Sequence, residues 1–509
     1  MRVTRHGQVT PLESAEVNVV EVHIAAAIVE TPNAVIAAEE VGVRVASTPF
    51  GSLFPDLQAD KHKLLASAQL EGDLRNLGDT MRDPGPYPTD HVGIPDSNIP
   101  AAYTYFGQFV DHDITSERLI GDRIRSIRSP QFDLDSMYGP DSVRKEGPES
   151  DQMKIGPLGD SPLGRVAGVD DENDLPRSGS TKLAQIADMR NDENLIIAQL
   201  HVAFLRAHNR LVTERELNFN DASRTLRQHY QWIVLDDYLK RIADPDIVER
   251  TKKKNRFFTP GNDFFMPREF SLAAFRFGHS MVREGYNKFN EKHTPATLDM
   301  LFQFTGFGGF GGKKKLPEDW VIDWSRFLDV GATTFNRARR IDTTLNKMLF
   351  DIPTAHLTDV TGEAKFFTGE GRLAVRNLIR GYVRELPTGQ AIAKKIRCNM
   401  LTATQIEAVA EQVSNEQLAA VRKSNFANQT PLWYYILAEA AHFRSTDNED
   451  HLGPVGSTIV AEVLIDILRR STDSILGPRY TRENPWIPTL PTEGKFDLAD
   501  LLRFARVLR

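Results

Sequence analysis

The pattern of apolar positions predicts a mainly helical protein beyond about residue 100. Apolar side chains at Ile459, Val463 and Ile467, with their neighbours, have the spacing of one buried helical face. The segment from Leu195 to Leu205 is apolar nearly all round, which is typical of a helix buried on every side. A further helix is expected over Trp232–Leu239. Because neither strand–helix alternation nor an internal repeat is found, we expect a mainly α fold with long loops.

Two N-terminal segments differ from this helical body. Residues 1–45 alternate short apolar stretches with acidic residues, and we interpret them as an N-terminal extension of unknown role. Residues 46–100 are rich in turn signals such as Asp83-Pro84-Gly85-Pro86, which predict a long irregular segment that wraps a larger body. The chain is therefore expected to consist of this extension and one large domain, residues 46–509.

Composition excludes several classes of function. The chain has 509 residues and a formal net charge of -7 at pH 7, which gives no electrostatic case for nucleic-acid binding. Cys398 is the only cysteine, which excludes an internal disulfide and a cysteine-based zinc or iron–sulfur site. No apolar run approaches the ~18 residues that a membrane span needs. The start, MRVTRHGQ, has no apolar signal-peptide core, so a cytoplasmic protein and one exported without a cleavable signal peptide are both expected possibilities.

Two polar segments hold side chains suited to proton transfer. Gln108 and His112 are one helical turn apart, with Asp111 near the same face. An imidazole can move a proton at neutral pH and an amide can orient a polar ligand, although a hydrogen-bonded core histidine fits the same pattern. Arg190 and Glu193 open the buried helix, where an unpaired charge would be costly, and this favours a site over a surface ion pair.

Two more segments suggest metal ligands. His279 follows Gly278 in an aromatic segment, where it is either a core histidine or an axial ligand beside which a flat group could lie. Oxygen-bearing side chains occupy every second position of another segment: Ser129, Gln131, Asp133 and Asp135. Hard oxygen groups in this pattern resemble a calcium loop, although not an EF-hand, and an acid-rich turn is the alternative.

Together these segments resemble the peroxidase–cyclooxygenase superfamily, the animal-type haem peroxidases, and the chain looks like a bacterial member. The resemblance extends from about Phe50 to the C-terminus. It rests on six motifs in the family order: Gln108-x-x-Asp111-His112-Asp113, Phe132-Asp133 through Tyr138-Gly139, Arg190-x-x-Glu193, Leu205-Arg206-Ala207-His208-Asn209-Arg210-Leu211, Phe275-Arg276-Phe277-Gly278-His279, and Arg376-Asn377-Leu378-Ile379-Arg380-Gly381.

The resemblance implies a haem peroxidase that reduces hydrogen peroxide and oxidises small organic donors or halides through high-valent iron. His112 would be the distal histidine, which moves a proton between the two peroxide oxygens. Arg190 and Gln108 would polarise the O–O bond. His279 would be the proximal iron ligand, with Asn377 hydrogen-bonded to its other ring nitrogen.

The resemblance also implies contacts around the haem. Arg380 and Arg276 would lie near the haem propionates or the haem edge. Asp111 and Glu193 match two carboxylates that form ester bonds to haem in mammalian members. Asn194 stands where one mammalian member has a sulfonium-forming methionine, so no third link is expected and efficient chloride oxidation is disfavoured.

Calcium is the second cofactor that the resemblance implies. The matching ligands are Asp113, Ser129, Gln131 through its carbonyl, Asp133 and Asp135, the last standing where Ser or Thr is common. A third carboxylate should keep this site calcium-like, and the ion would tie the segment of His112 to the loop. We interpret His201 and His208 as structural.

Three alternatives remain at this point. A fatty-acid dioxygenase of the same superfamily would carry a radical-forming tyrosine three residues before the proximal histidine, where this chain has Arg276. A haem-free, calcium-dependent interaction protein could retain the fold. A non-haem iron centre needs two histidines and a carboxylate, and the segment Asp111–Asp113 offers one histidine.

Overall fold

The computed structural model describes residues 47–57, 69–85, 96–120, 123–261, 263–331, 334–351, 371–447, 450–481, 483–490 and 494–508. The expected N-terminal extension, residues 1–45, lies outside these ranges. The helices are α2 (Leu70–Asp79), α3 (Ala102–Ile114), α4 (Asp135–Tyr138), α5 (Leu195–Glu214), α6 (Phe219–Trp232), α7 (Leu239–Ile242), α8 (Pro245–Lys253), α9 (Arg268–Ser271), α10 (Gly278–Met281), α11 (Leu298–Gln303), α12 (Lys347–Phe350), α13 (Leu373–Val383), α14 (Gly389–Ile396), α15 (Ala403–Val413), α16 (Asn415–Arg422), α17 (Leu432–Asp447), α18 (Pro454–Arg470) and α19 (Leu498–Phe504). The strands are β1 (Thr48–Gly51), β2 (Asp96–Pro100), β3 (Glu117–Ile120), β4 (Arg123–Ser126), β5 (Gly156–Pro157), β6 (Glu172–Asp174), β7 (Met266–Pro267), β8 (Gly285–Tyr286), β9 (Ala296–Thr297) and β10 (Arg337–Arg339). None of the helices in these ranges is both long enough and apolar enough to cross a membrane.

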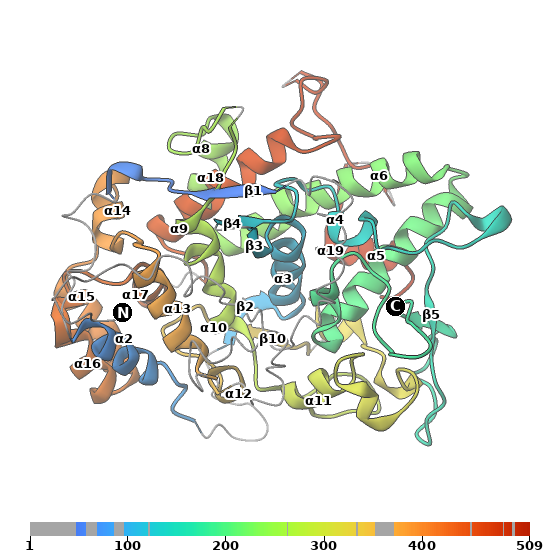
Figure 1. The fold of residues 1–509 in the computed structure, drawn as a ribbon, viewed down its shortest axis with the longest axis horizontal. Coiled ribbons are helices and arrows are strands. Elements are labelled where there is room, and N and C mark those ends of the chain that lie inside the picture. Colours follow the sequence, from blue (N-terminus) through green and yellow to red (C-terminus); the bar gives the residue numbers. More distant parts are fainter. Residues whose placement is uncertain are drawn as a thin grey trace.

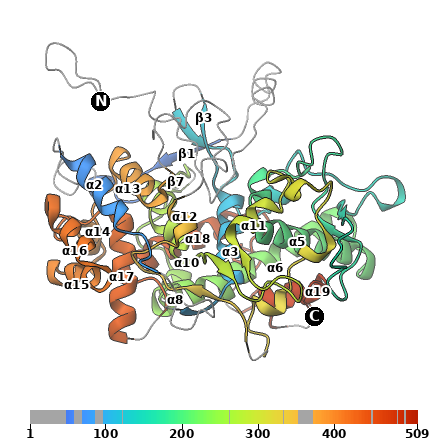
Figure 2. The ribbon, with the colours of Figure 1, turned by 90° about the horizontal axis from the view of Figure 1, so that it is seen from below.

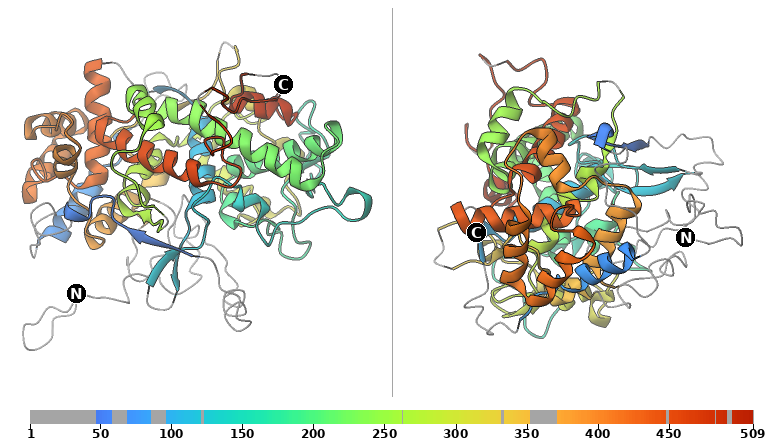
Figure 3. Two further views of the ribbon diagram at one scale, coloured as in Figure 1. Left: turned by 90° about the horizontal axis from the view of Figure 1, so that it is seen from above. Right: turned by 90° about the vertical axis from the view of Figure 1, so that its left-hand side faces the viewer.

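Helix α3 occupies the middle of a mainly helical body (Figure 1). The same body seen from below has α2 and α13–α17 on one side of α3, and α5, α6 and α11 on the other (Figure 2). The largest sheet has the strand order β3-β4-β1-β7, with β1 antiparallel to β4 and parallel to β7. The β3–β4 hairpin projects from the helices (Figure 3). Because most of the described elements are helices and the strands are short, the mainly α class expected from the sequence is confirmed.

The buried helices form where the apolar pattern predicts them. Helix α5 runs from Leu195 to Glu214, and the side chain of Asn194 caps its start by accepting from the backbone N–H of Ile197 at 3.0 Å. Ile459, Val463 and Ile467 all lie on α18 and are fully buried. These helices share one continuous hydrophobic core with α3. The core therefore fixes α5 against α3, which both contribute candidate site residues.

The helix expected over Trp232–Leu239 is confirmed, but its geometry is unusual. Helix α6 continues through a π-helical segment, η4 (Ile233–Tyr238), into α7. A π-helical turn shifts the side chains that follow it and is frequent at functional sites. Gly107 on α3 makes room for this segment, because a Cβ there would collide with the Tyr238 hydroxyl.

The expectation of an irregular segment over residues 46–100 is partly wrong. This region contains β1, β2 and the ten-residue helix α2, which packs on α13. Leu70, Leu74 and Leu77 are buried on one face of α2, at the spacing that any amphipathic helix shows. The turn-rich sequence on either side of α2 hid this short period.

A buried carboxyl group lies where α17 meets α18. Glu439 Oε2 accepts from the backbone N–H groups of Val455 at 2.9 Å and Gly456 at 3.3 Å, at the start of α18. Burial raises the pKa of Glu439 to about 8. The folded protein therefore holds this proton over a range of pH in which the unfolded chain, with a pKa of roughly 4.3, has lost it.

We expect the free energy of unfolding to fall as pH rises from roughly 4.3 to about 8, because the folded state binds more protons than the unfolded state in this interval. Glu439→Gln should flatten this part of the pH dependence, and Glu411→Gln, at an exposed position of α15, should leave it unchanged. Chemical denaturation between about pH 5 and about pH 9 measures the slope. A Glu439→Gln protein with the wild-type slope would contradict the assignment.

Candidate active site

A cavity lies between α3 and the segment formed by η5 (Ala274–Phe277) and α10. Its empty space, counted together with the open solvent at its mouth, is about 550 Å³. Gln108 and Asp111 line one side, and Arg276 and His279 line the other. Two pairs of residues far apart in the sequence therefore meet at one cavity, as the resemblance implied.

The imidazole of His279 is oriented by a neighbour on α13. Asn377 Nδ2 lies 3.0 Å from His279 Nδ1, the pairing that the sequence predicted. His279 is 7% exposed and lines the cavity. Because one ring nitrogen is engaged by Asn377, Nε2 is the nitrogen that could coordinate a metal in the cavity.

His112 lies in the interior, one turn along α3 from Gln108. Its side chain has no solvent exposure, and its Nδ1 lies 2.8 Å from Oδ1 of Asn191 on the short helix η3 (Met189–Asp192). Its Nε2 faces Glu193, 3.8 Å from Oε1. His112 does not line the cavity, whereas Gln108 and Asp111 on the same helix do.

Gln108 links the cavity to the residues that follow η3. Its Nε2 donates to Oε1 of Glu193, and its Oε1 accepts from Nδ2 of Asn194 at 3.2 Å. Burial raises the pKa of Glu193 well above its usual range, although the charge of Arg190 opposes this effect. Burial therefore favours the neutral carboxylic acid form of Glu193 beside Gln108.

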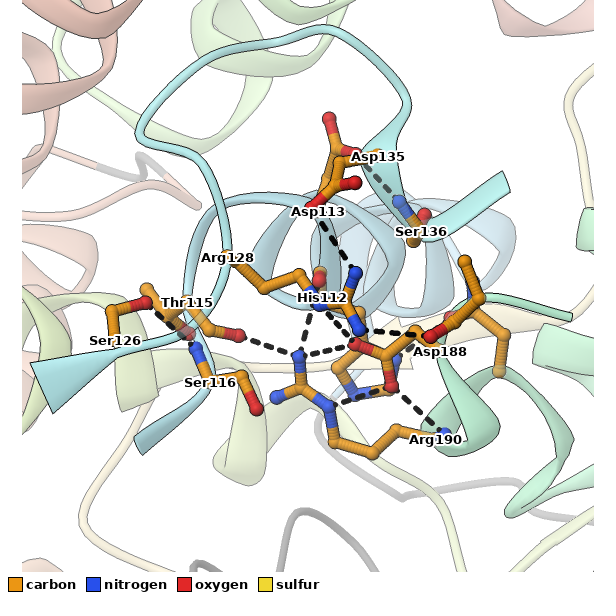
Figure 4. A network of polar contacts seen from close by, with 12 residues as sticks. His112, Asp113, Thr115, Ser116, Ser126, Arg128, Asp135, Ser136, Asp188 and Arg190 are labelled. Carbon is orange, nitrogen blue, oxygen red and sulfur yellow. Dashed lines mark hydrogen bonds and ion pairs between the residues drawn. The ribbon is translucent and has the colours of Figure 1, made fainter. Parts of the chain in front are cut away.

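Arg190 is held by a buried carboxylate and by the end of α3 (Figure 4). Its guanidinium pairs with Asp188 at 2.8 Å, and its Nη2 also donates to the carbonyls of His112 at 3.1 Å and Thr115 at 2.5 Å. Burial would raise the pKa of Asp188, but the cations Arg190 and Arg128 hold it well below its usual range. Nη1 of Arg190 has no hydrogen-bond partner among the described residues, so it is the donor available to a ligand.

Positive charge gathers on the side of the cavity opposite α3. Arg376 and Arg380 lie one turn apart on α13, and both act on Arg276. Burial, together with the charges of Arg380 and Arg376, lowers the pKa of Arg276 well below its usual range. The resemblance implied a role for Arg276 and Arg380 but none for Arg376. The i, i+4 spacing of Arg376 and Arg380 was the signal that could have identified it.

The expected calcium ligands come together around the end of α3. Asp113 is fully buried and accepts from the backbone N–H groups of Leu134 and Ser136 at 3.3 Å each. Burial, then the charges of Asp133 and Asp135, raise the pKa of Asp113 well above its usual range. Three carboxyl groups therefore lie close enough to repel one another.

Other contacts in this loop are already made within the protein. Ser129 Oγ donates to Asp133 at 2.8 Å, and the side-chain oxygen of Gln131 accepts from the backbone and hydroxyl of Thr472. Across the described residues, no group of three or more His, Cys, Asp or Glu side chains has the arrangement of a metal site. A calcium ion therefore stays a prediction.

Arg128 connects this loop to the buried ion pair. Its guanidinium lies 3.1 Å from Asp135 and 3.0 Å from Asp188, and it donates to the carbonyl of Ala187 at 2.8 Å. Figure 4 shows Arg128 and Arg190 on either side of Asp188. The role of Arg128 and Asp188 could not be predicted from the sequence, because neither residue belongs to a motif with a chemical role of its own.

His208 has the structural role expected for it. Its Nδ1 contacts the hydroxyl of Tyr138 at 2.8 Å, and its Nε2 contacts the carbonyl of Asp151 at 2.9 Å. Burial lowers its pKa to about 4, so the ring is neutral at pH 7.

Comparison with known proteins agrees with this geometry. Residues 128–307 match the family model described as animal haem peroxidase. Peroxidasin from Drosophila melanogaster is 23% identical over 312 residues, which cover 59% of this chain and 18% of that protein. The chain thus spans less than a fifth of that relative.

Solved structures show the same fold at low sequence identity. Peroxidase A from Dictyostelium discoideum superposes with a TM-score of 0.53 at 16% identity, covering 86% of this chain and 89% of that one. The fatty acid alpha-dioxygenase of Oryza sativa gives 0.51 at 10% identity, covering 80% and 75%. Residues 128–307 are therefore similar to the animal haem peroxidase family, and the chain shares the fold of these two solved proteins.

Proposed function

We propose that this protein is a haem peroxidase that reduces hydrogen peroxide and oxidises small organic donors or halides. The observation that carries the proposal is the cavity with His279, held by Asn377, on one side and Gln108 on the other. His279 would hold the iron of a bound haem, and Gln108 with the groups that it contacts would handle the protons of a peroxide substrate.

The cavity wall suits haem in shape and charge. Gly278 lines the cavity, and a Cβ added there would meet no atom within 4 Å, so the absent side chain leaves space for a flat ring. The buried arginines Arg276, Arg376 and Arg380 suit the two propionates, because anions would offset their mutual repulsion. His279 Nε2 would hold the iron.

The groups behind Gln108 suit the proton transfers of peroxide reduction. When bound, haem supplies the iron centre and the electrons that reduce the O–O bond. His112 takes a proton from one peroxide oxygen and delivers it to the other, which leaves as water. Gln108 orients the peroxide, and Arg190 supplies fixed positive charge next to the developing negative charge.

An ester link to haem from one or both of Asp111 and Glu193 forms part of the proposal. Asp111 lines the cavity and Glu193 contacts Gln108, which also lines it. With Asn194 in place of a sulfonium-forming methionine, no third link is proposed, and organic donors or the more easily oxidised halides are preferred over chloride.

Calcium binding at the end of α3 is proposed from the carboxyl cluster. Asp113, Asp133 and Asp135 carry like charges that a divalent cation would offset, and Ser129 and the Gln131 carbonyl add the oxygen ligands that calcium prefers. The cluster connects to Arg190 through Arg128 and Asp188, so the ion would stabilise the distal groups. Bacterial origin stays a prediction, and we propose with it a role in the response to oxidative stress.

Two other functions are outcomes of the test below. A fatty-acid dioxygenase would share the fold, but the position three residues before His279 holds the buried Arg276, which cannot form a tyrosyl radical. A haem-free, calcium-dependent interaction protein would lack the haem absorption altogether.

We expect the purified protein supplied with haem to show a Soret band that shifts rapidly after one equivalent of hydrogen peroxide. His112→Ala should slow this reaction about 10²–10⁴-fold, because it removes the general acid–base group. His451→Ala, which replaces a histidine whose Nδ1 contacts the carbonyl of Leu452, away from the site residues, should leave the rate near wild type. Stopped-flow absorbance measures both rates. A Soret band without a peroxide response would contradict the roles proposed for His112, Gln108 and Arg190. Oxygen uptake with a polyunsaturated fatty acid would favour a dioxygenase. A missing Soret band would favour the haem-free interaction protein.

We expect part of the haem to resist acid–acetone extraction after peroxide turnover, because ester formation needs both the carboxylate and turnover. Asp111→Asn and Glu193→Gln should each reduce the retained fraction, and the double variant should release all of it. Protein never exposed to peroxide is the control. Complete extraction of haem from the peroxide-treated wild type would contradict the ester links.

We expect prolonged EGTA treatment to remove calcium, to lower the unfolding temperature, and to slow the peroxide reaction that depends on His112. Calcium should restore the rate, whereas magnesium should not, because it demands a stricter octahedral geometry. Asp133→Asn should weaken calcium binding without changing the cavity wall. An unchanged haem spectrum and rate after EGTA would argue against the calcium site.

A further inference from the structure

We propose that Asn191 and His201 are positioning residues that fix the tautomer of His112 and leave its Nε2 as the proton-accepting nitrogen. The inference rests on the proposed peroxidase function, because it explains how His112 would be prepared to take a proton from peroxide. Neither Asn191 nor His201 lines the cavity, so both would act through His112 alone.

The three side chains form one buried hydrogen-bonded row. His112 comes from α3, Asn191 from η3 and His201 from α5, and none of the three has any solvent exposure. Asn191 Oδ1 lies 2.8 Å from His112 Nδ1, and Asn191 Nδ2 lies 2.9 Å from His201 Nδ1. The amide therefore bridges the two imidazoles by their equivalent nitrogens.

The chemistry of an amide decides where the protons lie. An amide nitrogen only donates and an amide oxygen only accepts. Asn191 Nδ2 therefore needs an acceptor at His201 Nδ1, and Asn191 Oδ1 needs a donor at His112 Nδ1. In the neutral form of His112, the form that can accept a proton, only one nitrogen carries hydrogen, so that hydrogen lies on Nδ1 and Nε2 has the lone pair.

The surroundings of His201 suit its part as an acceptor. Burial lowers the pKa of His201 to about 3, so the ring is neutral and can accept at Nδ1. Asp188 is the charged group that opposes this shift, and Asp188 is itself paired with Arg190 and Arg128. The ring of Phe109 packs edge-on against His201, with centroids 6.0 Å apart, which fixes the plane of the imidazole.

The resulting lone pair lies on the functional side of His112. Its Nε2 is 3.8 Å from Glu193 Oε1, the oxygen that accepts from Gln108, and Gln108 lines the cavity. In the proposed reaction, Nε2 accepts one proton from hydrogen peroxide and returns it to the departing oxygen, while haem provides the electrons. With the opposite tautomer, Nε2 would carry a hydrogen and could not accept that proton.

The direct test is the protonation of each ring nitrogen by ¹⁵N NMR. Long-range ¹H–¹⁵N correlations on protein labelled at histidine should show His112 protonated at Nδ1 and His201 protonated at Nε2. The diamagnetic ferrous carbon monoxide complex is suitable, and His112→Gln and His201→Gln assign the signals. A hydrogen on Nε2 of His112, which the reversed amide of Asn191 would produce, overturns the proposal.

Variants separate positioning from simple support of the fold. His201→Leu removes the acceptor for Asn191, and we expect mixed tautomers of His112 and a roughly tenfold slower binding of cyanide, whose acid form must lose a proton to a distal base. His201→Gln keeps an acceptor oxygen and should restore the rate to within about twofold. Asn191→Leu should cost about 100-fold, because it releases His112 itself.

The outcomes distinguish this inference from the peroxidase proposal. The NMR measurement does not require haem, so failure to bind haem would defeat the proposed function while the tautomers could still be read. Equal losses in His201→Leu and His201→Gln with an unchanged His112 tautomer would show a structural role only and overturn the inference. Wild-type cyanide binding in His201→Leu would overturn it as well.

Discussion

The buried pairing of Arg190 with Asp188 is the constraint on which the candidate site depends. The same guanidinium donates to the carbonyls of His112 and Thr115, so the end of α3 is fixed to the segment that precedes α5. Removing one partner of such a pair leaves an uncompensated buried charge, which typically costs about 3–5 kcal/mol. Helices α3 and α5 therefore keep one relative position, and Gln108 stays in contact with Glu193.

The charged groups on the two sides of the cavity are arranged differently. Around His112, the negative charge of Asp188 is offset within the protein by Arg190 and Arg128, and burial raises the pKa of Glu193. On the opposite side, burial and the charges of Arg380 and Arg376 lower the pKa of Arg276. Burial also lowers the pKa of Arg380, and the charge of Glu117 opposes only part of that shift. One side thus pairs its charges within the protein, whereas the other brings three arginines together.

The elements that could be predicted from the sequence are those whose signal is local. The all-round apolar stretch that became α5 and the pairing of Asn377 with His279 could both be predicted, the first from its pattern and the second from its family motif. Helix α2 was missed because turn signals surround its short apolar period. Asn191, Asp188 and Arg128 escaped because their importance comes from partners distant in sequence, which no spacing rule reveals.

The surroundings of His112 explain why its orientation can be set by hydrogen bonds. The imidazole meets the amide of Asn191 at Nδ1 and the carboxyl of Glu193 near Nε2, and burial raises the pKa of that carboxyl. Asp188 and Arg190 are paired with each other, and Arg190 contacts the backbone carbonyl of His112 rather than its ring. A directional amide contact can select one tautomer, whereas a carboxylate beside the ring would favour its doubly protonated form. The buried ion pair therefore fixes the backbone, and the uncharged amide of Asn191 fixes the side chain.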